Sequence, residues 1–292
     1  MPKDGLYRSI DEFQLAVDGF HGFCGLLLYA FANHPCDTKN IIIRNFIART
    51  AVSVRGVIHL WHTADFQDCW ILHRCLMDRL FHLVQLGRRS EYELFDDWSF
   101  YEQYKALNRV RSDQTFGAGH RTPAFGPTSE QKARFEKLSK SPPVWKRPKA
   151  EDVAKGMDLS CLYKYGYDYG SRHVHPMADD GQQDFFSITK LEPAPEVSDQ
   201  RSVLSNSILV SCMIVQEGLN QSAFKWRRFV FDFLSQLMSH LDDGSLDYGV
   251  TFQKVMCFSP KELCEPSASV VEPQSGHPPE GSKAILPDEY CF

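Results

Sequence analysis

The chain has 292 residues, of which 43% are hydrophobic and 24% charged, so it is long and apolar enough to bury a sizeable core. A formal net charge of −5 argues against a protein that coats nucleic acid non-specifically, although it is compatible with a local basic patch. The nine cysteines are scattered and form no C-x-x-C pair, which argues against a disulfide framework or a cysteine-built zinc site and favours a reducing compartment.

The first residues do not have the charged-then-apolar order of a secretory signal peptide. The most apolar early stretch, from Phe23 to Ala32, is about ten residues long, which is too short to span a bilayer. We therefore expect a cytoplasmic protein with no membrane partner.

Helical periodicity dominates the N-terminal third of the chain. Apolar residues recur at helical spacing over 9–31. A second helix begins at Asp37 or Thr38 and ends near residue 62, and a third covers about 65–86 and closes at Gly87. The second and third helices are long and apolar, which predicts the core of a helical bundle.

The middle of the chain is more polar. Residues 92–110 predict a peripheral helix, and residues 113–127 form a Gly-rich loop. A short basic helix follows from Thr128 to Lys140, and the prolines of 142–148 predict an extended linker. We expect this part to be an irregular insertion in the bundle, over about 113–150.

The C-terminal half returns to helix. One continuous helix is predicted over 153–175, stopped by Pro176 and followed by a polar loop over 177–196. Two further apolar helices are expected over 200–219 and 223–241, and a short strand or last helix over 250–258.

These patterns predict an all-α protein, with no strand alternation long enough for a sheet and no nucleotide-binding or hydrolase motif. We expect a multi-helix bundle domain over 1–258 and a Pro- and Ser-rich, partly disordered tail over 259–292.

The polar segment 167–176 is the strongest candidate for a functional site. Tyr167, Ser171 and His175 stand at i, i+4 and i+8, so they share one face of a continuous helix. Two hydroxyls and an imidazole in line can bind a polar ligand or a phosphate, and His175 at the helix end can act as an acid. The alternative is a buried polar ladder, in which the serine bonds back to its own helix.

A second constellation lies on the predicted helix 65–86. Arg74 and Asp78 are spaced for an intrahelical ion pair, and an arginine in an apolar helix needs a partner because burying an unpaired charge is costly. We expect this pair to meet the segment 167–176 and to aim the guanidinium at an anion. A purely structural or solvated pair is the alternative.

A polar stripe runs through His59, His62, Asp65, Cys69 and His73, which fall close to one face if the helix is continuous. Such a set can hold zinc or iron, but it lacks the paired Glu-x-x-His motifs of di-iron bundles. Histidines lining a wet groove are the preferred interpretation, and no metal or other cofactor is predicted.

Basic residues are densest over 132–149, where Phe135 and Trp145 interleave with them. Such a pattern can meet a nucleic-acid backbone, although a solvated basic face is the alternative. The residues predicted to bind nucleic acid are Lys137, Lys140, Lys146 and Arg147.

The arrangement of Arg74 and Asp78, followed by Tyr167-x-x-x-Ser171-x-x-x-His175, resembles a bacterial helical family catalogued as domain of unknown function 5677. That family has an L-x-R-x-x-x-E helix, where this chain has Asp78 in place of the glutamate. The resemblance covers about residues 10–220.

The family is similar in outline to the HEPN superfamily, whose members cleave RNA without metal as dimers, using an R-x(4–6)-H motif. Arg172 and His175 depart from that motif, because only two residues separate them. The resemblance implies a ribonuclease toxin or antiviral defence effector, acting as a homodimer or with a partner protein. It implies that His175, Arg172 and Arg74 are catalytic, supported by Asp78, Tyr167, Ser171 and His173. A non-catalytic helical binding module is the alternative function.

Overall fold

The computed structural model describes residues 10–113, 115, 127–175, 177–178, 181–190, 201–222 and 227–243. All regular structure within these ranges is helical, which confirms the predicted all-α class. The predicted element at 250–258, the tail 259–292 and most of the Gly-rich loop lie outside the described residues.

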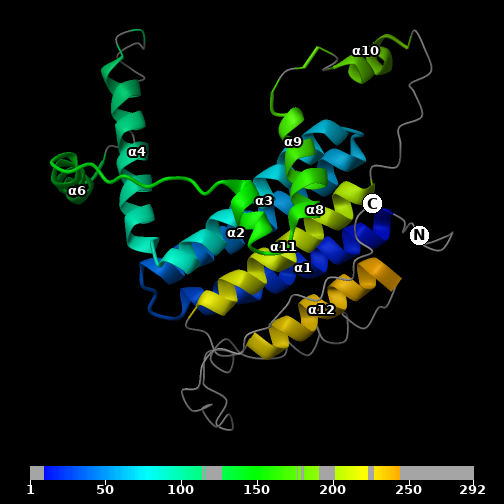
Figure 1. Cartoon of the computed structure of the whole chain (residues 1–292), viewed down its shortest axis with the longest axis horizontal. Helices are drawn as coiled ribbons and strands as arrows, with labels where there is room; N and C mark the ends of the chain where they lie inside the picture. The colour runs from blue at the N-terminus through cyan, green and yellow to red at the C-terminus, as the bar shows by residue number, and fades with distance from the viewer. Residues whose placement is uncertain are drawn as a thin grey trace.

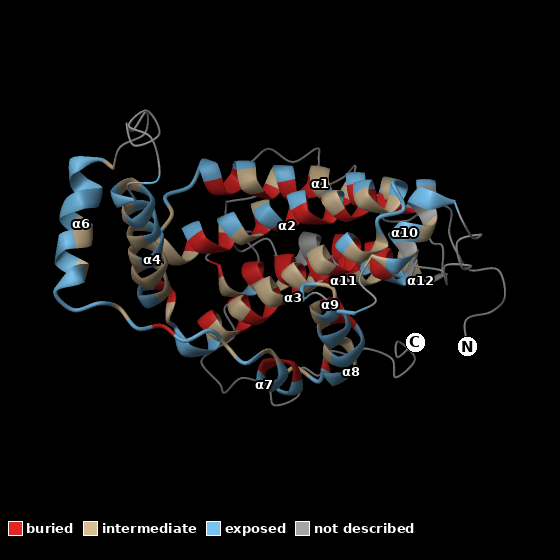
Figure 2. Cartoon of the chain, turned by 90° about the horizontal axis from the view of Figure 1, so that it is seen from above, coloured by how far each residue is buried: buried red, intermediate tan, exposed pale blue. Residues whose placement is uncertain are grey.

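The core is a bundle of four long helices. They are α1 (Ile10–Ala32), α2 (Thr38–His62), α3 (Phe66–Arg89) and α11 (Arg201–Gln221), which lie side by side (Figure 1). Their buried faces turn toward one another, while their outer faces are exposed (Figure 2). The periodicity that predicted the first three helices is therefore the periodicity of their burial.

A fifth helix, α12 (Arg227–Asp243), covers part of this bundle and packs against α11. The ring of Phe233 on α12 stacks on that of Phe23 on α1, with ring centroids 4.3 Å apart. Leu234 and Leu237 are buried beside it, so α12 contributes to the same core.

Both α2 and α3 begin at an aspartate that caps the helix. The carboxylate of Asp37 accepts a hydrogen bond from the Asn40 amide at 2.8 Å, so the first of the two predicted caps begins α2. Asp65 caps α3 by accepting from the Asp68 amide at 3.3 Å. Ala64 between them has a φ of 61°, so the two helices are separate.

The predicted end of α3 at Gly87 is wrong. The helix continues to Arg89 and ends at Ser90, which adopts the left-handed conformation. Gly87 lies inside the helix, where the end of the Gln221 side chain from α11 crosses it. This glycine therefore marks a helix–helix contact and not the end of α3.

Two helices have long apolar windows, Phe13–Ala32 in α1 and Ser202–Gln221 in α11, which meet the length and composition of a membrane span. The apolar stretch in α1 is thus longer than the ten residues identified from the sequence. Each helix directs one apolar face into the shared core, where Phe20, Leu27 and Val215 are fully buried. Packing within the bundle therefore accounts for their composition.

An arm leaves the bundle at the C-terminal end of α3. It consists of α4 (Tyr92–Ser112) and α6 (Ser129–Ser139), which pack on each other beside the bundle (Figures 1 and 2). The α6 helix begins with a capping box, in which Thr128 and Gln131 exchange hydrogen bonds.

The linker after α6 is anchored by Trp145, which is only 5% exposed. Its ring packs on Phe95 and Trp98 of α4 and against His82 of α3. The expectation that Trp145 meets nucleic acid is therefore wrong, because this ring joins the arm to the bundle.

The continuous helix expected over 153–175 is also wrong. The structure has four short pieces: α7 (Ala150–Lys155), α8 (Ser160–Leu162), the π-helix η1 (Tyr163–Asp168) and α9 (Tyr169–Arg172). The turn after α7 contains Asp158 with a φ of 58°, which breaks the helix. These pieces lie along α3 (Figure 2).

The loop expected over 177–196 contains a helix, α10 (Gln182–Thr189). It starts at Gly181 and ends at Lys190, both in the left-handed conformation. Phe185 and Ile188 of α10 are largely exposed, so the helix lacks the buried stripe by which the other helices were recognised.

Candidate functional site

The segment η1–α9 approaches α3 closely because two glycines face it. A Cβ atom on Gly166 would lie 2.7 Å from the Nε2 atom of His73. A Cβ atom on Gly170 would lie 2.8 Å from the backbone oxygen of Trp70 and 3.0 Å from the Cβ atom of Arg74. The pair at i and i+4 thus gives η1–α9 a side without side chains, and this brings Arg74 within reach of the hydroxyls beside it.

Four polar side chains meet across this contact. The Nε atom of Arg74 donates to the Ser171 hydroxyl at 2.8 Å, and its NH2 group donates to the Tyr167 hydroxyl at 3.3 Å. The NH1 group lies 3.2 Å from the Asp78 carboxylate. The Tyr167 hydroxyl in turn donates to Asp78 at 3.0 Å. The structure therefore brings together two constellations whose contacting residues are 89 or more positions apart in the sequence.

The contacts define which hydrogen-bonding groups are in use. Ser171 donates its proton to the backbone oxygen of Tyr167 at 2.8 Å, as in the predicted polar ladder. Two of the five N–H groups of the Arg74 guanidinium donate hydrogen bonds, and its NH1 group forms the ion pair with Asp78. The side chain is 23% exposed, so the remaining N–H groups can meet an external acceptor such as a phosphate oxygen.

The electrostatics keep the network in one protonation state. Burial raises the pKa of Tyr167, and the nearby Asp78 carboxylate raises it further, because both disfavour a phenolate. Tyr167 therefore stays a hydrogen-bond donor at neutral pH. The guanidinium also lies over the Tyr167 ring, 4.9 Å from its centroid.

The other predicted catalytic residues lie just beyond this network. Arg172 is the last residue of α9 and is exposed. His175 follows in a bend and is exposed, so it does not continue the helical face of Tyr167 and Ser171, as the i+8 spacing predicted. The helix ends three residues too early for that register. Pro176 lies outside the described residues.

His173, which stands between Arg172 and His175 in the sequence, is half-buried. Its ring packs edge-on against Tyr169, with centroids 5.0 Å apart, and Tyr169 packs in the same way on Trp70 of α3. These aromatic contacts fix the end of α9 to α3, and thereby the start of the exposed turn that carries His175.

The polar stripe that was weighed as an alternative metal site is divided by the break between α2 and α3. His62 is exposed at the end of α2, whereas Asp65 caps α3. His73 is fully buried, and its Nδ1 atom lies 3.1 Å from the Ser207 hydroxyl of α11. Within the described part of the chain, no three acidic, histidine or cysteine side chains are grouped to hold a metal ion.

The buried cysteines described here belong to the packed hydrophobic core. Cys69 is buried, donates to the backbone oxygen of Val57 and has its pKa raised to about 12 by burial. Cys24 and Cys212 are buried free thiols in the core. Cys161, by contrast, is disulfide-bonded, although the scattered cysteines argued against a disulfide framework.

The predicted nucleic-acid-binding residues are all exposed. Lys137 is on α6, Lys140 directly follows it, and Lys146 and Arg147 belong to the linker. None of them adjoins the Arg74 network in the sequence or in a described contact, so they form a separate surface on the arm.

Two features of the site were not predicted from the sequence, and they differ in whether the sequence marks them. The glycines at 166 and 170 have the i, i+4 spacing that allows close helix approach, and this signal is readable in the sequence. The π-helix has no such signal, although π-helical turns are frequent at functional sites. It places Tyr167 and Gly166 toward α3 within a single turn.

Comparison with known proteins gives one match. Residues 40–188 match the family described as "Family of unknown function (DUF5677)". No curated protein and no solved structure matches the chain. The matched residues include α3 and all of η1–α9, so every member of the Arg74 network lies inside them. Because the match covers more than half of the 292 residues, the chain belongs to this family of unknown function, DUF5677.

Proposed function

We propose that this chain is a metal-independent, HEPN-like ribonuclease that serves as an effector of a bacterial antiphage or toxin-like system. The observation that carries the proposal is the Arg74 network, which fixes α9 to α3 and leaves Arg172 and His175 exposed at its end. The resemblance to HEPN enzymes supplies the substrate class and the expectation of a homodimer.

In this proposal the reaction is attack of an RNA 2′-hydroxyl on the adjacent phosphorus. His175 accepts the 2′-hydroxyl proton as general base or returns a proton to the departing 5′-oxygen as general acid. The bond between the phosphorus and the 5′-oxygen breaks, which leaves a 2′,3′-cyclic phosphate and a 5′-hydroxyl. No oxidant, reductant or metal enters this balance.

Two arginines stabilise the charge that develops on the phosphorane. Arg172 is exposed and can approach a phosphate directly. Arg74 has unused N–H groups and is held in place by Asp78 and Ser171. Preorganised donors of this kind need no rearrangement when the negative charge forms. Tyr167 and Ser171 therefore act as positioning residues.

A non-catalytic binding module is the second candidate function. It is favoured by one observation: both hydroxyls of the network already donate, to Asp78 and to the backbone oxygen of Tyr167. In this alternative the network locks η1–α9 onto α3, and the exposed end of α9 contacts a partner protein of a defence complex.

The test is incubation of the purified full chain with total RNA in EDTA, beside the variants His175→Ala and Arg172→Ala. His59→Ala is the matched control, because His59 is also exposed but belongs to α2. We expect cleavage by the wild type and by His59→Ala, and a loss of about 100-fold or more in His175→Ala, the usual contribution of general acid–base catalysis. Absence of cleavage by a folded wild-type protein would favour the binding module.

A further inference from the structure

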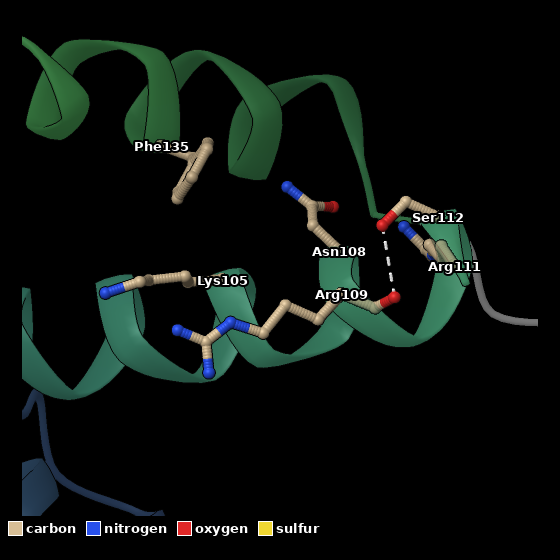
Figure 3. Close-up of a pocket in the computed structure, with 6 residues that line it drawn as sticks. All are labelled: Lys105, Asn108, Arg109, Arg111, Ser112 and Phe135. Atoms are coloured by element: carbon tan, nitrogen blue, oxygen red, sulfur yellow. Dashed lines mark hydrogen bonds between the residues drawn. The ribbon is translucent and has the colours of Figure 1, made fainter.

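A groove with a cationic lining opens between α4 and α6, on the arm and away from the Arg74 network. Its volume is about 540 Å³. The lining residues are Lys105, Asn108, Arg109, Arg111, Ser112 and Phe135, all drawn in Figure 3. Three of them are cationic and none is acidic.

The helical register of α4 produces this lining. Lys105, Asn108, Arg109 and Ser112 stand at i, i+3, i+4 and i+7, so they form one face of the helix, turned toward α6. In Figure 3, the amide of Asn108 projects into the gap between the two helices, and the Arg109 guanidinium extends along α4 toward Lys105. The groove therefore has cations along one wall and a neutral hydrogen-bonding group at its centre.

The opposite wall is aromatic. The ring of Phe135 stacks on Tyr104 with centroids 4.3 Å apart and an interplanar angle of 21°. Phe135 is only half-buried and faces the groove, as Figure 3 shows. It thus offers an apolar ring surface beside the cations.

Four acidic residues of α4 and its C-cap have partners of their own, one of which is Lys105 of the groove. Asp96 and Asp97 hold Arg134 at 2.6 and 2.7 Å and so fasten α6 to α4. The Asp113 carboxylate accepts hydrogen bonds from the backbone amide and hydroxyl of Thr115. Glu102 lies 3.3 Å from Lys105 on an exposed face, where such pairs are weak and exchange readily with another anion.

We propose that this groove binds single-stranded RNA, with Lys105 and Arg109 holding phosphates and a base stacking on Phe135. Cations beside an exposed aromatic ring, with an amide able to meet a base edge, are the combination that single-stranded nucleic acid requires. An acidic peptide would use the cations but would leave the exposed part of the Phe135 ring and the Asn108 amide unused. This inference rests on the proposed function for its choice of RNA, and it adds the surface that holds the substrate.

The separation from the Arg74 network sets the length of RNA required. Arg74 and Arg89 are about 20 Å apart along α3, and a similar length of α4 separates Tyr92 from Lys105. The sum of these two lengths is an upper bound on the separation, and a stacked strand advances roughly 3.4 Å per nucleotide, so at most about 12 nucleotides are needed to span both. A probe of about 20 nucleotides is therefore long enough to reach either site.

The test measures binding without cleavage, by fluorescence anisotropy of a labelled 20-nucleotide oligouridine that carries a 2′-O-methyl group at each position. In EDTA, the double variant Lys105→Gln/Arg109→Gln should weaken binding at least tenfold. It should also reduce the slope of log affinity against log salt by about 1.4, which corresponds to two phosphate contacts. Phe135→Leu, which keeps an apolar side chain against Tyr104, should weaken binding about fivefold or more without changing that slope.

The matched control is Arg55→Gln/Lys155→Gln, which removes the same charge from exposed positions on α2 and α7. Equal weakening by both double variants, no binding by the wild type, or equally good competition by polyglutamate would each overturn the inference. Binding with these properties, together with intact unmodified RNA, would overturn only the proposed ribonuclease. Cleavage of unmodified RNA with no groove-dependent binding would overturn only this inference.

Discussion

Helix α3 has two contact faces of opposite chemistry. Toward α11, Leu83 packs beside Gly218, and the fully buried Leu76 and Leu80 belong to the same core. Toward η1–α9, the contact is made by Arg74 and Asp78 with two hydroxyls. The first face depends on non-directional burial, whereas the second depends on individual hydrogen bonds and on two glycines. We therefore expect the two faces to respond differently to substitution.

The largest effect is expected on the apolar face. Leu76→Ala removes a fully buried side chain and should lower the free energy of unfolding by about 3 kcal/mol. Urea unfolding followed by circular dichroism measures it. Leu94→Ala, at a position that is 39% exposed on α4, should change the stability by less than about 0.5 kcal/mol. Equal losses in the two variants would show that the face toward α11 is not a packed core.

A pH effect is expected from His73, whose ring lies between the two faces. Its Nε2 atom faces Gly166 of η1, and its Nδ1 atom lies 3.1 Å from the Ser207 hydroxyl of α11. Burial lowers its pKa from 6.5 to about 4. Below pH 6.5 the unfolded chain binds a proton that the folded chain does not, so the free energy of unfolding falls as the pH falls from about 6.5 to 4. The full loss is roughly 3 kcal/mol for this group.

Unfolding of His73→Asn at a series of pH values should therefore show a slope smaller by about one proton across this range. Leu94→Ala on α4, which removes no titratable group, is the control and should keep the wild-type slope. An unchanged slope in His73→Asn would mean that the imidazole is not buried.

The close approach of α9 is tested by a pair of glycine substitutions. Gly170→Ala places a methyl group 2.8 Å from the backbone oxygen of Trp70, which cannot rotate away, and should cost about 2 kcal/mol. Gly25→Ala meets no atom within 4 Å in the interior of α1 and should stabilise the protein by about 0.5 to 1 kcal/mol. Thermal unfolding distinguishes them, and the same sign for both would contradict the packing described.

The smallest effect is expected from the ion pair itself. A double-mutant cycle with Arg74→Met and Asp78→Ala should give a coupling energy of about 1 kcal/mol, because the pair is partly shielded from solvent. The exposed pair Lys155 and Glu151, also spaced i and i+4, is the reference and should give a smaller coupling. A coupling no larger than that of the reference would mean that Arg74 is not held by the network.

The apolar face of α3 was predictable from the sequence because its buried residues recur at helical spacing. The bounds of α2 follow from the Asp37 cap and the apolar spacing, and those of α3 are missed only where Gly87 serves packing. The meeting of Arg74 and Asp78 with Tyr167 and Ser171 was also predicted, because a charge in an apolar helix requires a partner.

The remainder depends on contacts between distant segments. The break at Asp158 and the π-helix after it arise where the chain folds along α3, and no local pattern marks them. Trp145 resembles a surface residue because basic residues surround it, yet its ring closes an aromatic cluster with α4. The position of His175 follows from the end of α9 at Arg172 and not from i+8 spacing.

The most direct test of the proposed chemistry is analysis of the ends of RNA fragments produced by the full chain in EDTA. Two matched oligonucleotides are compared: one is entirely ribose, and the other has a single 2′-deoxy residue on the 5′ side of the cleaved bond. We predict fragments with a 2′,3′-cyclic phosphate and a 5′-hydroxyl from the first, and no cleavage at that position in the second. Cleavage of the 2′-deoxy substrate at an undiminished rate, or fragments that carry a 5′-phosphate, would contradict the account.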